Sequence, residues 1–151
     1  MHHASHTDYD FVMDLFRKNR AVFPHIRTTE IKERIERRQV IVENGIVITY
    51  HRVRRLYRIG DVDINKGDCM LHQIVSSTQG DGTAVAVINK FFSWVNASVF
   101  LSVRRENQRA IKFYHKVGMS EVGSISWSDG KIPGVIFCKR QGASLEPFIS
   151  S

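Results

Sequence analysis

A glycine-rich turn that leads into an apolar helix is the part of this sequence best suited to chemistry. The stretch STQGDGTAVAVINKFFSWV, residues 77–95, contains Gly80 and Gly82 before its apolar segment. The first N–H groups of a helix have no partner within it, and the helix dipole adds about half a positive charge there. Glycines let an anion approach the backbone. The stretch therefore predicts a phosphate-binding turn, with an ordinary strand-to-helix turn as the alternative.

The turn differs from the two commonest phosphate-binding motifs. It has neither the Gly-Lys-Ser/Thr of a P-loop nor the GxGxxG of a dinucleotide-binding fold. Asp81 stands between the two glycines, where its carboxylate would repel a phosphate unless it points away. We expect Asp81 to cap the helix, because its side chain can accept a backbone N–H.

Two motifs in this part of the chain resemble those of the GNAT family, the acetyl-CoA-dependent N-acetyltransferases. Gln79-x-x-Gly82-x-Ala84 resembles the family's Gln/Arg-x-x-Gly-x-Gly/Ala signature, and ENQRAIKFYHKVGM, residues 106–119, resembles its second motif. The matching positions of the second motif are Asn107, Ala110, Phe113, Tyr114, Lys116, Gly118 and Met119. The resemblance covers residues 69–139, whereas residues 1–60 match only in the order of elements.

The resemblance implies that acetyl-CoA or coenzyme A binds to this strand, turn and helix, without a metal. In the family the turn holds the pyrophosphate, and the backbone of the preceding strand pairs with the pantetheine arm. The positions that carry over as cofactor-binding residues are Gln73, Ile74, Val75, Gln79, Gly80, Asp81, Gly82, Thr83, Ala84, Asn107 and Tyr114.

Acetyl transfer from a thioester to an amine needs a proton acceptor for the amine and a proton donor for the leaving sulfur. Tyr114 lies where the family's tyrosine acid lies, so the resemblance implies that it is the donor; the alternative is an amphipathic core tyrosine. Asn107 precedes it by seven residues on the same helical face, where it either binds the cofactor or caps the helix. His72 is the candidate base because its ordinary pKa of about 6.5 is suitable. The alternative for His72 is a lone histidine within the core.

Basic residues exceed acidic ones, with 22 Lys and Arg against 15 Asp and Glu and a net charge of +7. The excess is concentrated in HRVRRLYR, which contains Arg52, Arg54, Arg55 and Arg58. Such a charge predicts an anionic partner without identifying it. The four arginines therefore form either a nucleic-acid or phosphate surface, or a solvated face at the ends of strands.

The periodicity of the apolar residues predicts the helices and strands that must position these residues. We expect a first helix capped by Thr7 with Asp10 at the capping-box position, in a region that ends at Pro24. Further helices are predicted at residues 28–38, 83–95 and 106–118. Strands are predicted on both sides of an Asn44-Gly45 hairpin turn, once within 54–64, and at 69–75, 98–103, 120–126 and 134–140.

This order of elements, with the resemblance, predicts an α/β (α+β) GNAT fold. We expect a central mixed, mostly antiparallel sheet of 6–7 strands, splayed in the middle and flanked by about four helices. One GNAT acetyltransferase domain is expected over residues 1–151, with the ends 1–6 and 142–151 allowed to be loose. A monomer and a homodimer are both compatible with the sequence.

The sequence composition also bears on the cellular location of the protein and on the state of its cysteines. No apolar run approaches the ~18–20 residues that span a bilayer, and the first residues do not read as a signal peptide. We therefore expect a cytoplasmic protein that does not contact a membrane. Cys69 and Cys138 are too few for a disulfide framework or a zinc site, and we expect buried free thiols.

The expected function is transfer of an acetyl group from acetyl-CoA to an amine by direct attack. The acceptor is left open between an amine linked to nucleic acid, which the basic excess favours, and a protein amine. The alternatives are a small-amine acetyltransferase and a GNAT-fold module that binds coenzyme A or nucleic acid without turnover. Tyr114 favours an enzyme, because a module without turnover has no need of an acid.

Overall fold

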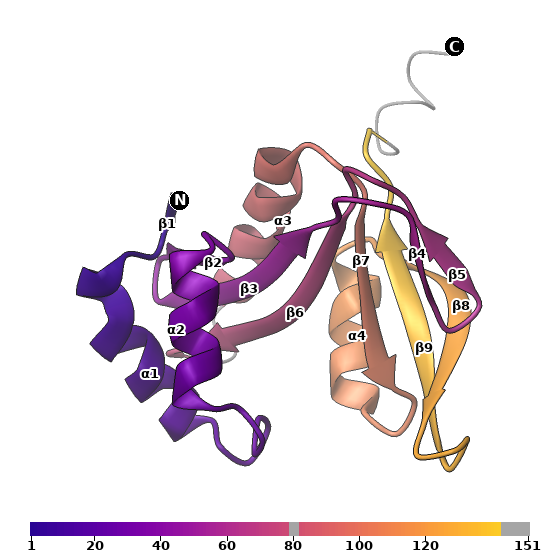
Figure 1. Ribbon diagram of the computed structural model, residues 1–151, viewed down its shortest axis with the longest axis horizontal. Helices are drawn as coiled ribbons and strands as arrows, with labels where there is room; N and C mark the ends of the chain where they lie inside the picture. The colour runs from indigo at the N-terminus through magenta and orange to yellow at the C-terminus, as the bar shows by residue number, and fades with distance from the viewer. Residues whose placement is uncertain (79–81, 143–151) are drawn as a thin grey trace. The chain divides into compact units, whose positions relative to one another are not determined.

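The structure is a computed structural model, and it describes residues 1–78 and 82–142. Its helices are the 3-10 turn η1 (His6–Asp8), α1 (Tyr9–Lys18), α2 (Thr28–Glu36), α3 (Thr83–Val95) and α4 (Gln108–Lys116) (Figure 1). Its strands are β1 (His2–His3), β2 (Val40–Glu43), β3 (Ile46–Arg52), β4 (Tyr57–Ile59), β5 (Val62–Ile64), β6 (Cys69–Ser76), β7 (Val99–Arg104), β8 (Ser120–Trp127) and β9 (Ile132–Lys139).

Seven of these strands form one sheet in the order β1-β2-β3-β6-β7-β9-β8, and β4 and β5 form a separate ribbon. Antiparallel pairing joins β1 to β2, β2 to β3, β7 to β9 and β8 to β9, whereas β6 and β7 are parallel. The recorded β6–β7 register pairs Cys69 with Val99 and Met70 with Phe100, although β6 continues to Ser76. The predicted mixed, mostly antiparallel sheet with four α-helices is confirmed for the described residues.

The chain forms two compact units. The first comprises Met1–His51 and Leu71–Ile88, and the second comprises Arg52–Met70 and Asn89–Ser151. A single domain over residues 1–151 therefore stays a prediction, and each unit is described by itself below.

In the first unit, α1 and α2 lie side by side and cover one face of β2, β3 and β6 (Figure 1). The helical spacing of the apolar residues in α1 buries Val12, Leu15 and Phe16 together. Val47 of β3 and Val75 of β6 join the same core. Each fully buried side chain of this kind contributes about 1.5–3 kcal/mol, so the core fixes both helices to these strands.

The hairpin predicted at Asn44-Gly45 is confirmed. Asn44 and Gly45 both have positive φ, at 47° and 75°, which is the type I′ geometry that matches the twist of the flanking strands. The Ser77 N–H donates to the Gly45 carbonyl at 3.0 Å, so the end of β6 is held against this turn.

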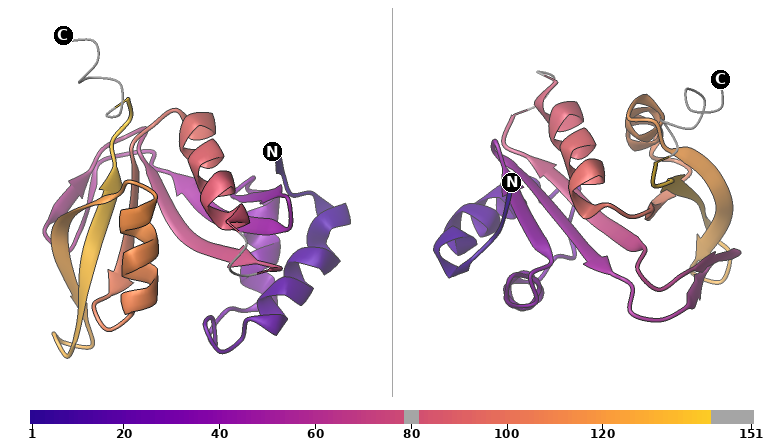
Figure 2. Two further views of the ribbon diagram at one scale, coloured as in Figure 1. Left: turned by 180° about the vertical axis from the view of Figure 1, so that it is seen from behind. Right: turned by 90° about the horizontal axis from the view of Figure 1, so that it is seen from above.

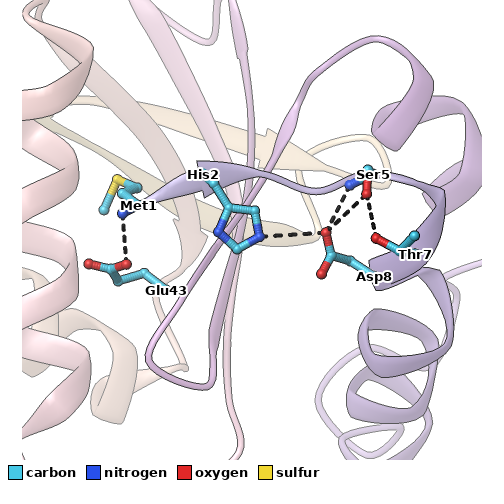
Figure 3. Close-up of polar contacts among 6 residues, drawn as sticks. All are labelled: Met1, His2, Ser5, Thr7, Asp8 and Glu43. Atoms are coloured by element: carbon cyan, nitrogen blue, oxygen red, sulfur yellow. Dashed lines mark hydrogen bonds and ion pairs between the residues drawn. The ribbon is translucent and has the colours of Figure 1, made fainter.

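The start of the first helical region differs from the prediction. The Ser5 N–H donates to Asp8 Oδ2 at 2.9 Å, and the hydroxyl oxygens of Ser5 and Thr7 lie 2.7 Å apart, two contacts drawn in Figure 3. His2 Nε2 lies 3.5 Å from the same Asp8 oxygen. The capping box is therefore Ser5 with Asp8, and Thr7 with Asp10 was wrong, because both pairs have the same spacing and adjoin the same helix.

The predicted end of the first helical region and the predicted single strand within 54–64 also need correction. The helix α1 ends at Lys18, well before Pro24, where the Asn19 side-chain amide donates to the Leu15 carbonyl at 2.8 Å. The single strand expected within 54–64 is two short strands, β4 and β5, because the chain turns at Gly60 and Asp61 between them.

In the second unit, β7, β9 and β8 are covered by different elements on their two faces (Figure 2). Phe137 of β9 contacts Tyr114 of α4, with ring centroids 5.6 Å apart. Its neighbours Ile136 and Cys138 point to the opposite face and pack with Ile64 of the β4–β5 ribbon. The period of two along β9 thus places α4 on one face of the sheet and the ribbon on the other.

The ribbon also holds the outer edge of β8, the last strand in the order. The Asp61 N–H donates to the Ser124 carbonyl at 3.1 Å, and the Ser124 N–H donates to Asp61 Oδ1 at 2.7 Å. One residue of the ribbon thus satisfies both outward-facing backbone groups of Ser124.

Candidate active site

The turn between β6 and α3 is described at its two ends. Gln79, Gly80 and Asp81 lie outside the described residues, so their predicted contacts with a pyrophosphate and the predicted Asp81 cap remain predictions. Gly82 has φ +79°, and among the described residues other than its chain neighbours no heavy atom lies within 4 Å of the position that a Cβ would take. The Ala86 N–H donates to the Gly82 carbonyl at 3.3 Å, and Thr83 begins α3. A left-handed glycine with open space beside a helix start fits an approaching phosphate.

The entry to the turn is a local hydrogen-bonded ring. The Thr78 N–H donates to Ser76 Oγ at 3.2 Å, and the Ser76 hydroxyl donates to the Thr78 carbonyl. A cavity of about 250 Å³ adjoins this entry and is lined on its other side by the end of α1, including Lys18. Lys18 forms an exposed ion pair with Asp14 of the same helix at 3.0 Å.

A buried hydroxyl organises the middle of β6. Thr49 of β3 is fully buried, and its Oγ1 accepts the Gln73 N–H at 3.0 Å while its hydroxyl donates to Gln73 Oε1. The backbone N–H of Gln73 is thus bonded to a side chain. The bond leaves the Gln73 carbonyl uninvolved, so cofactor binding by the backbone of Gln73, of the half-buried Ile74 and of Val75, whose side chain belongs to the core, stays a prediction.

His72 is not the lone histidine that the sequence suggested. His51 Nδ1 and His72 Nε2 lie 2.8 Å apart, at hydrogen-bond distance. The two rings are nearly parallel, with an interplanar angle of 16° and centroids 5.0 Å apart. The core alternative for His72 does not describe it either, because the residue is exposed.

These contacts show that β6 is irregular at His72 and Gln73. Thr49 and His51 are two residues apart on β3, so their side chains share one face of the sheet. Their partners are consecutive residues, which a regular strand would direct to opposite faces. The two β6 side chains therefore reach the same face, as they do at a β-bulge, a distortion that is frequent beside active sites.

The surroundings lower the proton affinity of both imidazoles. Although part of the His72 side chain reaches solvent, burial of its ring among the surrounding protein atoms, the positive charge of Arg34 and the adjacent His51 lower the pKa of His72 from 6.5 to about 3. Burial and Arg34 also lower the pKa of His51. Arg34 belongs to α2, where it hydrogen-bonds Gln39 Oε1 at 3.3 Å. Both rings are therefore neutral at pH 7.

In the second unit, Tyr114 of α4 is half-buried, and its ring centroid lies 5.8 Å from that of Phe113. Burial raises the pKa of Tyr114 to about 12, so its hydroxyl keeps its proton at neutral pH. Asn107 is the N-cap of α4, where its Oδ1 accepts the Ala110 N–H at 3.2 Å. Both predicted residues thus lie on α4 as expected, and the structure shows the capping alternative for Asn107.

The four arginines of the basic stretch do not share one environment. Arg52 donates to the carbonyls of Gly67 at 3.3 Å and Val95 at 3.0 Å, and Arg58 pairs with Asp63 at 2.9 Å. Arg54 and Arg55 are exposed and pair with no carboxylate in the described part of the chain. An anion surface here would therefore depend mainly on Arg54 and Arg55.

Cys69 and Cys138 are buried and free, as predicted. Burial raises the pKa of both thiols, that of Cys138 to about 11. Within residues 1–78 and 82–142, no three His, Cys, Asp or Glu side chains gather in a group that could hold a metal ion. No helix in those ranges is both long and apolar enough to cross a membrane.

Sequence reasoning missed Thr49 and His51. The available signal was the spacing of Val47, Thr49 and His51, which predicts one shared face along a strand. Nothing in that spacing identifies the partner strand or its register, so neither residue could be joined to Gln73 or His72.

Comparison with known proteins identifies the architecture. No family model matches the sequence, and no curated protein matches it. A GNAT-family acetyltransferase from Streptococcus agalactiae 2603 has a TM-score of 0.73 at 16% identity, covering 91% of this chain and 92% of that one. A GNAT-family acetyltransferase from Bacillus cereus ATCC 10987 has a TM-score of 0.66 at 19% identity, covering 91% of this chain and 94% of that one.

A third solved structure, a mutant spermidine N-acetyltransferase from Vibrio cholerae, gives a TM-score of 0.60 at 19% identity and covers 96% of each chain. At identities below 25%, structural similarity of this kind shows a shared fold and nothing more. The chain therefore has the fold of the GNAT acetyltransferases, as the two sequence motifs predicted.

Proposed function

We propose that this chain, with its GNAT fold, is an acetyl-CoA-dependent N-acetyltransferase. The observation that supports the proposal best is the position of the two motifs within that fold. The described residues of one motif, Gly82, Thr83 and Ala84, lie at the start of α3, and the other motif lies on α4, with the left-handed Gly82 and the protonated Tyr114 among their residues.

Acetyl-CoA would bind along β6 and the following turn. The open space at Gly82 and the start of α3 would receive the pyrophosphate. The backbone of Ile74 and Val75, with the carbonyl of Gln73, would pair with the pantetheine arm, since the Gln73 N–H is bonded to Thr49. The thioester brought by the cofactor supplies the acetyl group.

Two side chains would handle the protons. Tyr114, which keeps its proton at neutral pH, would donate to the leaving sulfur. His72 would hold the water molecule that takes the proton of the amine, since a pKa of about 3 makes its imidazole too weak a base to take that proton itself. The amine attacks the thioester carbonyl, so that a C–N bond forms and the C–S bond breaks.

The acceptor we propose is an amine carried by a nucleic acid or a protein. The net charge of +7 and the exposed Arg54 and Arg55 favour an anionic macromolecule over a polycation. A small polyamine is the competing class, because spermidine N-acetyltransferases share the fold.

The deciding experiment measures thiol release from acetyl-CoA with each acceptor class, after binding of acetyl-CoA has been established by thermal shift. Mass spectrometry of RNA, protein and polyamine fractions would then locate the added acetyl group. Binding without thiol release for every acceptor would favour the alternative, a GNAT-fold module without turnover. A wild-type protein that neither binds acetyl-CoA nor releases thiol would refute the proposal.

A further inference from the structure

We infer that one end of the second unit binds single-stranded nucleic acid, with cations on the phosphates and an aromatic ring stacked on a base. The basic end, as we call it, consists of Trp94 and five cations: Arg52, Arg54, Arg55, Lys66 and Arg140. Binding there needs neither acetyl-CoA nor turnover. The inference rests on the proposed function only in making the bound strand the carrier of the acceptor amine.

The positive charge of the protein belongs to one of its two units. By sequence, the first unit has equal numbers of basic and acidic residues, whereas the second has 14 Lys and Arg against 7 Asp and Glu. The whole net charge of +7 is therefore that of the second unit. A charge concentrated in this way attracts an anionic partner to that unit.

Three strands share one edge within the second unit, where β6 and β7 begin and β9 ends (Figure 1). The register pairs Cys69 with Val99, and Val99 with Lys139. Arg140 thus follows directly beyond this edge, where it is exposed and its guanidinium carbon lies 5.7 Å from the centre of the Phe100 ring. One cation of the basic end is therefore fixed at the edge of the sheet.

Two loops bring further cations to the same edge. The Val53 N–H donates to the Asp68 carbonyl at 2.8 Å, and Asp68 directly precedes β6. Arg54 and Arg55 follow Val53 in the chain, and both are exposed. Lys66 is exposed in the turn that leads to Asp68. The strand edge and the two loops thus present their cations together.

Arg52 joins this turn to the last turn of α3. Its guanidinium donates to the Gly67 carbonyl at 3.3 Å and to the Val95 carbonyl at 3.0 Å. Trp94, which precedes Val95, is 40% exposed, and its ring stacks on that of the buried Phe91 with centroids 6.4 Å apart. An aromatic ring that is backed by the core and partly open to solvent therefore belongs to the same end.

These cations carry uncompensated charge. Apart from Arg52, whose N–H groups bond carbonyls, they pair with no carboxylate among residues 1–78 and 82–142. Asp68 brings an acidic group to this end, and its Oδ2 accepts the Asn65 N–H of its own turn at 3.0 Å. A ligand with several negative charges in a row would neutralise the cations that remain.

The chemistry of the basic end favours a single-stranded nucleic acid over other anions. Four of its five cations are arginines, whose planar guanidinium matches phosphate. Bases of a single strand can stack on Trp94, whereas an acidic protein offers no such bases and a duplex keeps its bases stacked on one another. The chain that follows Trp94 is polar, with the Gln141 amide donating to Asn96 Oδ1 at 2.9 Å, which suits bases better than lipid.

The charge contacts are tested by fluorescence anisotropy with labelled oligouridine and oligothymidine, without acetyl-CoA. Lys66→Gln combined with Arg140→Gln should weaken binding and lower the slope of log K against log salt by roughly 1.4, at about 0.7 for each phosphate contact of a single strand. Lys32→Gln combined with Arg37→Gln is the matched control, because it removes the same charge from exposed sites of the first unit. That control should leave the slope unchanged.

The stacking contact is tested at Trp94. Trp94→Leu should weaken oligonucleotide binding by roughly 5- to 100-fold, the loss of one stacked base, whereas Trp94→Phe keeps a ring and most of the affinity. The sequence has two tryptophans, so Trp127→Phe leaves Trp94 as the fluorescent one. Its emission should then be quenched as the oligonucleotide binds.

Several outcomes would overturn the inference: no binding of either oligonucleotide, equal binding of duplex, equal losses in the two charge variants, or full affinity of Trp94→Leu. Binding of polyglutamate or phosphatidylserine vesicles in place of the oligonucleotides would also overturn it. The acetyltransferase proposal would survive these results with a protein amine or a polyamine as acceptor. Conversely, a wild type that binds the oligonucleotides but neither binds acetyl-CoA nor releases thiol would refute the proposed function and leave the binding surface standing. Thermal melts show that the comparison is between folded proteins.

Discussion

Replacing Thr49 with valine tests the polar bond that shapes β6. Valine has nearly the same shape as threonine but no hydroxyl, so the change removes both contacts with Gln73 and leaves the buried volume filled. Because Thr49 is fully buried, no water can take the place of its hydroxyl from the β3 side.

The expected loss follows from the bonds involved. Each hydrogen bond contributes about 0.5–1.5 kcal/mol net, and a buried N–H left unpaired costs about 1–3 kcal/mol. Gln73 is half-buried, so the lower part of the second range applies, and the added methyl group returns up to about 0.8 kcal/mol. We expect a net loss of about 2 kcal/mol in the free energy of unfolding. For a chain of 151 residues this lowers Tm by about 4–8 °C.

Thr49→Ser is the matched control, because it keeps the hydroxyl and removes only a methyl group. Its expected cost is about 1 kcal/mol, similar to a buried Ile→Val change. Urea titrations of the three proteins should therefore rank wild type first, serine second and valine last, with similar m values. If apolar packing alone governed this site, the Thr49→Val protein would be at least as stable as the wild type, and the Thr49→Ser protein would be the least stable of the three. That order would refute the role assigned to the Thr49 hydroxyl.

Four further results are expected. Gly82→Val should abolish acetyl-CoA binding in calorimetry, since a side chain at φ +79° is strained and occupies the space left for a phosphate; unchanged affinity would place the cofactor elsewhere. Tyr114→Phe should lower turnover by roughly 10²-fold with normal acetyl-CoA affinity, and equal rates would leave Tyr114 a purely structural role. If the acceptor is a nucleic acid, replacing Arg54 and Arg55 with glutamine should flatten the salt dependence of binding by roughly 0.9 log unit for each lost phosphate contact; a wild-type response without salt dependence would exclude that acceptor. The pKa of His72 is about 3 in the folded protein against 6.5 ordinarily, so the unfolded chain takes up the proton first and stability falls as pH drops from 6.5 towards 3. The free energy of unfolding falls by at most about 1.4 kcal/mol per pH unit, and by less because His72 is exposed. Urea denaturation of His72→Gln should show a weaker dependence of stability on pH than the wild type.

Local chemistry decided which elements could be predicted from the sequence. The Asn44-Gly45 turn was predictable because two adjacent residues with positive φ favour few other types. The apolar stripe of α3, with Val87, Phe91 and Val95 buried, follows from helical periodicity alone. The first cap was not decidable locally, since Ser5 and Thr7 each precede an aspartate by three residues.

The candidate site divides in the same way. Tyr114 could be singled out because its motif is contiguous in sequence and lies on one helix. The bond between His51 and His72 could not be predicted from the sequence. The two residues are twenty-one positions apart in the chain, and their contact depends on the register of β3 against β6. A one-residue slip of that register would direct one ring to the opposite face, so the pair exists only once the sheet has formed.

The Asp61–Ser124 contact has a consequence for how the sheet meets other molecules. β8 ends the strand order, and such a strand normally offers a row of unpaired amides and carbonyls to any strand that comes alongside. At Ser124, near the middle of β8, those groups are taken by a backbone N–H and a carboxylate. A strand from a second copy would find no free ladder there, and the carboxylate would repel its carbonyl oxygens. At the opposite end of the order, β1 is only two residues long and offers little edge to extend. Pairing with a strand from a second copy is therefore opposed at Ser124 by occupied groups and a negative charge, and at β1 by a short edge.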